Sequence, residues 1–215
     1  MKKNLTELVF ILDKSGSMAG LEKDTIGGFN AMLKKQRQVE GECRITTVLF
    51  NSRYELLHDR IDIRAVRPIT EKEFLVGGCT ALLDAIGMTI QKIVTAQKNT
   101  AKEYQADKVM FVIITDGEEN ASRVYSSVQI KKMIQYQKER YGWEFIFLGA
   151  NIDAVETAGR FGIHADRAVD YVADGAGTAL NFQMMSETVA SFRECGAVPT
   201  ACLDEIRRDS QKRGR

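Results

Sequence analysis

The sequence predicts an α/β fold, a Rossmann-like, doubly wound and mainly parallel sheet with helices on both faces. The first observation is that short apolar stretches alternate with longer amphipathic stretches through most of the 215 residues. The second is that residues 8–12 and 109–115 are almost continuously apolar, which is typical of strands buried on both faces. Together they favour parallel strands joined by right-handed crossovers.

The composition is that of an ordinary globular protein, with 44% hydrophobic and 27% charged residues. Its 30 Lys and Arg residues nearly balance 29 Asp and Glu residues, which argues against a nucleic-acid-binding or membrane-surface protein. No apolar stretch approaches the ~18 residues of a transmembrane helix. Residues 1–7 lack the apolar core of a signal peptide, and the four cysteines form no CxxC pair. We therefore expect reduced thiols and a cytoplasmic protein.

The first part of the chain is predicted to form the centre and one edge of the sheet. Residues 8–12 form the central strand, and an amphipathic helix follows over about 21–39 before Gly41 ends it. Residues 43–50 are rich in β-branched side chains, and 54–58 follow after a tight turn. We expect these two stretches to pair as an antiparallel hairpin, with one antiparallel strand at the sheet edge.

Residues 59–76 have the least regular pattern of the chain. Short strand pieces at 61–63 and 66–69 are compatible with it, but Pro68 excludes a long strand. After this segment, Thr80 is predicted to open a helix with an apolar inner side.

The second part of the chain continues the alternation. Strands are predicted over 109–115, 143–148 and 168–172, and helices over 124–141, 152–160 and 180–192, with a turn at 175–177. We assign 1–195 to one domain and 196–215 to a polar, basic C-terminal tail. This tail is predicted to be frayed and solvated, with a short helix at 203–208 at most; the alternative is a basic arm for an acidic partner.

Oxygen-bearing side chains follow both buried strands. Asp13, Ser15 and Ser17 come directly after the first strand, and Asp116 follows the second. Because ligands of an open α/β sheet bind beyond the carboxyl ends of its strands, we expect these side chains to lie close together. Carboxylate and hydroxyl oxygens suit a hard cation such as Mg²⁺.

The segment Asp13-Lys-Ser15-Gly-Ser17 resembles the DxSxS motif of von Willebrand factor type A (VWA) domains. In that family the motif opens a metal-ion-dependent adhesion site (MIDAS), which a distant Thr and a distant Asp complete. Thr80 and Asp116 are the matching residues here. The resemblance implies direct metal bonds from Ser15 and Ser17, bonds through water from the two aspartates, and either kind from Thr80.

The resemblance covers roughly residues 5–190 and is strongest to compact intracellular bacterial and phage members. It implies a protein-interaction module that binds Mg²⁺ or Mn²⁺, with Ca²⁺ less favoured, and through the cation an acidic group of a partner protein. Intracellular members act in multiprotein assemblies, including partners of AAA+ ATPases. In some members ligand binding moves the last helix, for which the candidate here is 180–192.

Other interpretations of the same residues are kept open. Taken singly, the Ser and Asp residues or Thr80 are ordinary helix N-caps, and Asp116-Gly is a common turn pair. A metal-dependent hydrolase is an alternative, since Asp13 ends a central strand as an aspartyl nucleophile would. However, Ser15 stands where such phosphatases place their acid, and no adjacent Lys or His offers activation. A structural domain with an unused site is the third possibility.

Four other side chains lie near the candidate ligands in the sequence, and we predict that none of them binds the metal directly. Glu118 and Glu119 are predicted to face solvent, and Cys79 to be a small buried residue. Asp84 lies one helical turn beyond Thr80. We interpret it as a favourable charge in the first helical turn. The alternative is that its carboxylate accepts hydrogen bonds from the residues that bind the metal.

Overall fold

The computed structural model describes residues 4–214; the predictions for 1–3 and Arg215 lie outside this range. Over these residues a six-stranded sheet has the order β3-β2-β1-β4-β5-β6. Every neighbouring pair is parallel except β2 and β3. The predicted fold class is therefore confirmed. The strands are β1 (Thr6–Asp13), β2 (Cys43–Phe50), β3 (Tyr54–Asp62), β4 (Lys108–Thr115), β5 (Glu144–Gly149) and β6 (Ala168–Asp170).

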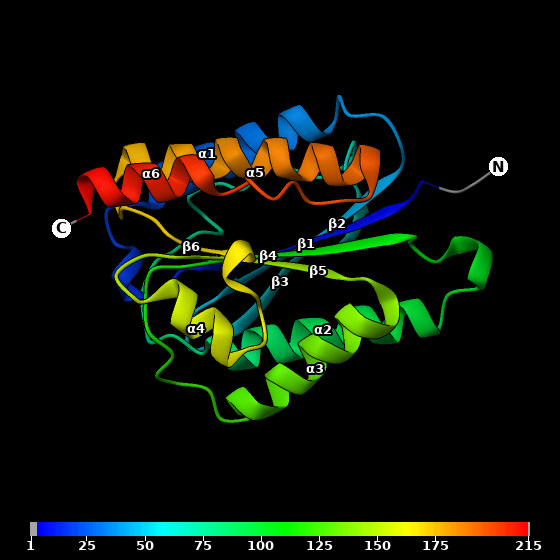
Figure 1. The fold of residues 1–215 in the computed structure, drawn as a ribbon, viewed down its shortest axis with the longest axis horizontal. Helices are drawn as coiled ribbons and strands as arrows, with labels where there is room; N and C mark the ends of the chain where they lie inside the picture. The colour runs from blue at the N-terminus through cyan, green and yellow to red at the C-terminus, as the bar shows by residue number, and fades with distance from the viewer. Residues whose placement is uncertain (1–3, 215) are drawn as a thin grey trace.

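Helices cover both faces of the sheet (Figure 1). Leu8, Phe10 and Leu12 of β1 belong to the apolar core on one face, and Val9 and Ile11 to the core on the other. None of the helices within residues 4–214 combines the length and apolar character needed to cross a membrane. One face carries α1 (Glu22–Gln36), α5 (Gly175–Cys195) and α6 (Asp204–Arg213), and the other carries α2 (Leu82–Lys98), α3 (Ser127–Tyr141) and α4 (Ala154–Arg160).

The edge hairpin is longer than predicted. β3 continues to Asp62, so that the piece expected at 61–63 is largely the end of this strand. Register shifts interrupt its pairing with β2, and Arg60 has a positive φ of 51° there. The prediction of a short strand at 66–69 is wrong, because these residues form no strand.

The predicted turn at 175–177 is also wrong, because these residues form the first turn of α5. The Asp174 carboxylate accepts a hydrogen bond from the Gly177 backbone N–H at 2.7 Å and caps the helix. A Cβ at Gly177 would lie 2.1 Å from the Val172 carbonyl oxygen. Glycine is therefore required at this position by close packing, although the sequence pattern suggested a turn.

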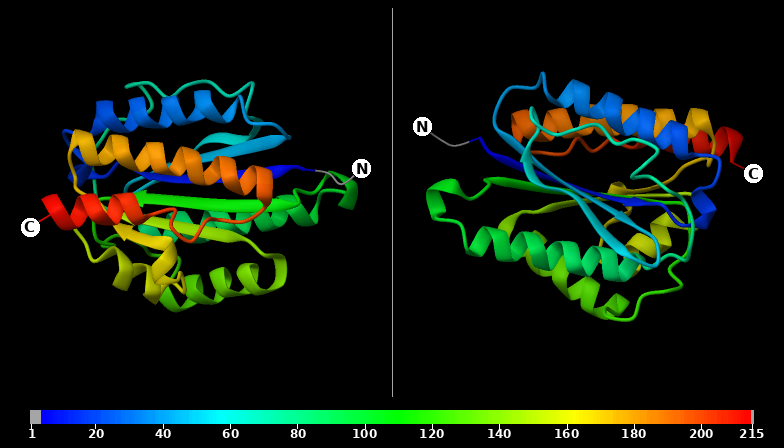
Figure 2. Two further views of the ribbon diagram at one scale, coloured as in Figure 1. Left: turned by 45° about the horizontal axis from the view of Figure 1, so that its top comes forward. Right: turned by 180° about the vertical axis from the view of Figure 1, so that it is seen from behind.

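The interpretation of 196–215 as a frayed, solvated tail is wrong for most of its length. α6 extends well past the predicted helix, and it packs beside α5 as Figure 2 shows. Leu203 and Ile206 are only 0% and 1% exposed. Arg213 forms an ion pair with Asp174 at the start of α5. The segment therefore completes the apolar core on the α1 and α5 face.

Candidate metal site

The two candidate carboxylates lie at the carboxyl edge of the sheet. β1 and β4 are neighbours, as predicted, with Leu12 paired to Ile114. Asp13 ends β1, and Asp116 directly follows β4. Parallel pairing places the two side chains at the same edge, because equivalent ends of both strands meet there.

Three hydroxyl groups converge beside these carboxylates. The Oγ atoms of Ser15 and Ser17 are 3.0 Å apart. A Cβ added to Gly117 would lie 2.9 Å from Ser17 Oγ, 3.1 Å from Thr80 Oγ1 and 3.8 Å from Ser15 Oγ. The hydroxyls therefore surround one small volume, and the glycine after Asp116 leaves that volume open.

Asp13 is fully buried, and both of its carboxylate oxygens accept hydrogen bonds. Oδ1 accepts from the backbone N–H of Ser15 at 2.7 Å, and Oδ2 from the hydroxyl of Thr115 at 2.6 Å. Burial raises the pKa of Asp13, while these hydrogen bonds act in the opposite direction. The carboxylate is thereby fixed in one orientation at the base of the site.

Asp116 differs, because neither of its buried carboxylate oxygens has a hydrogen-bond partner among the described residues. Burial raises the pKa of Asp116; the Ser17 hydroxyl, which is near the carboxylate but does not meet hydrogen-bond geometry, opposes this rise, and the charge of Asp13 adds to it. Burial, together with these two carboxylates, also raises the pKa of Tyr171. A buried carboxylate without donors is unfavourable unless a cation or other partner accompanies it. The donor set therefore fits a hard divalent cation.

Thr80 is held in place by the loop that follows β4. Its backbone N–H donates to Asn120 Oδ1 at 2.9 Å. In return the backbone N–H groups of Asn120 and Ala121 donate to the Thr80 carbonyl at 3.0 and 3.2 Å. The prediction that Thr80 opens the helix is wrong, because α2 begins at Leu82 with Ala81 as its N-cap. The Thr80 hydroxyl is therefore free of a capping role.

The loop with Ser15 and Ser17 is joined to the loop that precedes Thr80. The Gly16 N–H donates to the Gly78 carbonyl at 3.0 Å, and the Gly77 N–H to the Lys14 carbonyl at 2.9 Å. Asn51, which follows β2, donates from Nδ2 to the Gly77 carbonyl at 2.7 Å. Gly77 and Gly78 have φ values of +154° and +83°, which favour glycine. The hydroxyls therefore come from two loops that share one hydrogen-bond network.

Glu119 has a structural role that sequence analysis missed. Its carboxylate accepts hydrogen bonds from the backbone N–H groups of Leu83, Ala121 and Ser122, at 2.8, 2.9 and 2.7 Å. The prediction that Glu119 faces solvent is therefore wrong, whereas Glu118 is exposed as predicted. Since Leu83 lies in the first turn of α2, Glu119 ties the loop after β4 to this helix.

Asp84 anchors the same loop from the helix side. It lies in the first turn of α2, as predicted. Its carboxylate also accepts from the backbone N–H groups of Arg123, Val124 and Tyr125, at 2.8, 2.9 and 2.9 Å. Cys79 is exposed, which corrects the prediction of a buried residue. Within residues 4–214, no three His, Cys, Asp or Glu side chains are grouped to hold a metal, so hydroxyl donors are essential to any site here.

Comparisons with known proteins concern the fold. No family model and no curated protein match the sequence. A VWA protein from Catenulispora acidiphila is 17% identical with a TM-score of 0.59, over 89% of this chain and 44% of its own. The vWF domain of the type V pili tip protein Mfa5 from Porphyromonas gingivalis is 11% identical with a TM-score of 0.62, over 93% of this chain and 99% of its own.

A third similar structure is proximal thread matrix protein 1 from the mussel byssus, solved with a zinc-occupied MIDAS motif. It is 12% identical with a TM-score of 0.58, over 86% of this chain and 46% of its own. This chain thus spans less than half of the byssus and Catenulispora proteins. Identities this low establish a shared architecture without establishing a shared activity. The chain has the fold of a von Willebrand factor type A domain.

Proposed function

We propose that this protein is a metal-dependent protein-interaction module. Asp13, Ser15, Ser17, Thr80 and Asp116 bind one divalent cation, and the cation binds an acidic group of a partner protein. The observation that carries the proposal is the buried Asp116 carboxylate, which lacks a hydrogen-bond partner in the described chain beside three converging hydroxyls.

The donor set favours Mg²⁺ or Mn²⁺ over Ca²⁺, because it offers few carboxylates and several hydroxyls. The zinc-occupied MIDAS of the byssus protein supports a divalent cation in this fold. The two carboxylates balance the charge of such an ion, and hydroxyl donors are neutral. When bound, the cation supplies an electrophilic position for a carboxylate ligand.

The site is open on the side that a partner would approach. Gly16, Ser17, Cys79 and Glu118 are exposed around it. We propose that the partner is a subunit of a multiprotein assembly, for which an AAA+ ATPase is a candidate. We also propose a cytoplasmic location, since four free thiols, two of them exposed, fit a reducing compartment.

Binding is favoured over hydrolysis by the state of Asp13. An aspartyl nucleophile needs an accessible carboxylate oxygen. Both oxygens of Asp13 instead accept hydrogen bonds from Ser15 and Thr115, and the residue is 0% exposed. These contacts suit a carboxylate that orients its neighbours.

A pull-down from the lysate of the source cell tests the proposal. The bait is used with Mg²⁺, with EDTA, and as the Asp116→Ala variant; Glu205→Ala, an exposed position on α6, is the matched control. We expect proteins that are retained only by the wild type and the control in Mg²⁺. The same set of proteins in every lane would contradict metal-bridged recognition.

A further inference from the structure

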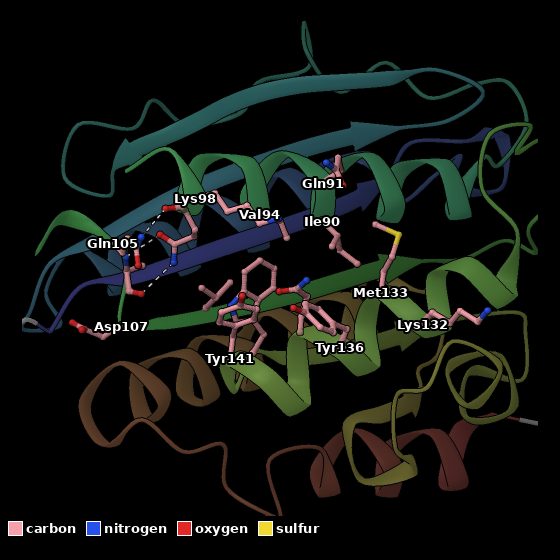
Figure 3. A pocket seen from close by; sticks show the side chains of 15 residues that line it. Ile90, Gln91, Val94, Lys98, Gln105, Asp107, Lys132, Met133, Tyr136 and Tyr141 are labelled. Carbon is pink, nitrogen blue, oxygen red and sulfur yellow. Dashed lines mark hydrogen bonds between the residues drawn. The ribbon is translucent and has the colours of Figure 1, made fainter. Parts of the chain in front are cut away.

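A cavity of about 620 Å³ opens between α2 and α3, at the amino-terminal edge of the sheet (Figure 3). None of the candidate metal ligands lines it. Its volume falls within the range of roughly 300–1,000 Å³ that is typical of small-molecule sites. We call this cavity the α2–α3 pocket. Its lining includes Ile90, Val94, Met133, Tyr136, Gln137 and Trp143.

Aromatic rings form much of the lining of the α2–α3 pocket. Trp143 is 5% exposed and stacks on Phe111, with ring centroids 5.6 Å apart. Tyr136 and Tyr141 line the same pocket, are 56% and 53% exposed, and pack edge to face at 6.0 Å. A fixed inner ring and two exposed outer rings favour a flat apolar ligand.

Gln137 brings an unsatisfied polar group to this apolar lining. The residue is 5% exposed, and its Oε1 accepts no hydrogen bond within the described residues. The neighbouring Gln97 has both ends of its amide paired with Ala106, at 3.0 and 3.2 Å. Because the terminal torsion of glutamine is soft, a ligand N–H or O–H in the pocket can recruit Gln137 Oε1.

The charges around the pocket are predominantly positive. Lys98 and Lys132 lie at opposite ends of it, as Figure 3 shows, and neither forms an ion pair with a described residue. Asp107 also lines the pocket, at the end near Lys98. Two cations against one carboxylate favour a ligand that carries a negative group.

We propose that the α2–α3 pocket binds a small planar aromatic anion that carries an N–H or O–H donor. The ring packs against Trp143 and Tyr136, the donor binds Gln137 Oε1, and the anionic group lies near Lys98 or Lys132. This site is separate from the candidate metal site, so occupation of the pocket requires no cation.

A pair of fluorescent probes tests this proposal. The first is 2-anilinonaphthalene-6-sulfonate, in which the amine lies too far from the sulfonate to bond to it, and the second is its N-methyl derivative, which lacks the N–H donor. We expect saturable binding of one molecule of the first probe, with the N-methyl probe about fivefold weaker, as for one hydrogen bond. In Gln137→Leu this difference should disappear, because the acceptor is gone.

Because Gln137 is buried, a second variant that changes only the two lysines of the pocket tests the proposal without altering the core. Lys98→Gln with Lys132→Gln should weaken both probes severalfold and reduce the salt dependence of binding, whereas Lys34→Gln on α1 should change neither. Three results would overturn the proposal: no saturable binding, a probe difference that persists in Gln137→Leu, or self-association of the protein that closes the pocket with a second copy. Sedimentation analysis detects the last of these.

Discussion

Two buried charged side chains at opposite edges of the sheet have opposite surroundings. Asp116, at the carboxyl edge, has no hydrogen-bond partner for either oxygen among the described residues. Arg193, at the amino edge, is 1% exposed and donates to the carbonyl oxygens of Gln36, Val39 and Gly41. Carbonyl groups at the end of a helix lack partners within the helix, so this cation stabilises the end of α1.

Arg193 is a structural charge, whereas Asp116 is the charge to which we assign cation binding. The two terminal nitrogens of the Arg193 guanidinium find their acceptors within the fold, although Nε has none among the described residues, and these contacts connect α1 with α5. Those of Asp116 are missing, although the hydroxyl groups of Ser15, Ser17 and Thr80 converge beside the next residue, Gly117. A buried charge that the fold leaves unpaired indicates an external partner, because it otherwise lowers stability.

The largest expected effect is at Arg193. Arg193→Leu removes the donors from the buried carbonyl of Gln36 and the partly buried carbonyls of Val39 and Gly41, so we expect the free energy of unfolding to fall by about 3 kcal/mol or more. Urea unfolding measures this loss, with exposed Arg208→Leu as the control that changes little. A loss below about 1 kcal/mol would contradict the structural role assigned to Arg193.

Gly117→Ala is expected to have the next largest effect, on cation affinity. The new Cβ would stand 2.9 Å from Ser17 Oγ and 3.1 Å from Thr80 Oγ1, in the volume assigned to the cation. We expect Mn²⁺ affinity to fall at least about tenfold, which is about 1.4 kcal/mol. Gly159→Ala, where nothing lies within 4 Å of the added Cβ, should leave Mn²⁺ affinity unchanged.

Asp116→Asn should raise stability when no cation is present. The substitution removes a buried charge without partners and keeps the side-chain shape, so we expect a gain of about 1 kcal/mol. Thermal unfolding in EDTA measures it. In Mg²⁺ the order should reverse, because only the wild type gains from binding. A variant that is less stable than the wild type in EDTA would contradict the unpaired state of Asp116.

The smallest expected effect concerns His58, a buried group that has a partner. Burial lowers the pKa of His58, whose ring lies 3.0 Å from Thr47 Oγ1. A lowered folded-state pKa gives stability that is present above the unfolded pKa of about 6.5 and is lost as pH falls through the folded value. The wild type should therefore lose more stability on acidification than His58→Gln. Exposed His164→Gln should behave like the wild type.

Sequence reasoning located the candidate ligands because topology alone brings them together. The apolar stretches before Asp13 and Asp116 identified two buried strands, and parallel strands share a carboxyl edge. Thr80 was reached only through the resemblance to VWA domains. Its position depends on Asn120, which lies 40 residues further along the chain. No local pattern predicts such a contact.

The predictions that are wrong fail for similar physical reasons. Glu119 binds the backbone of Leu83, 36 residues away, so its charge alone suggested a solvent-facing side chain. α6 is strongly polar, and few apolar side chains anchor it to the core, among them Leu203 at its N-cap and Ile206. So few apolar residues suggested a solvated tail with only a short helix. Gly177 resembled a turn residue because close packing and conformational freedom both select glycine.

Calorimetric titration with Mn²⁺ tests the central claim most directly, using the wild type and the double variant Ser15→Ala with Ser17→Ala. These substitutions remove two hydroxyl donors that lie 3.0 Å apart, while the aspartates and Thr80 remain. We predict saturable binding of one ion per chain to the wild type and none to the double variant. Equal affinity in both proteins, or no binding to the wild type, would show that the converging oxygens are not a cation site.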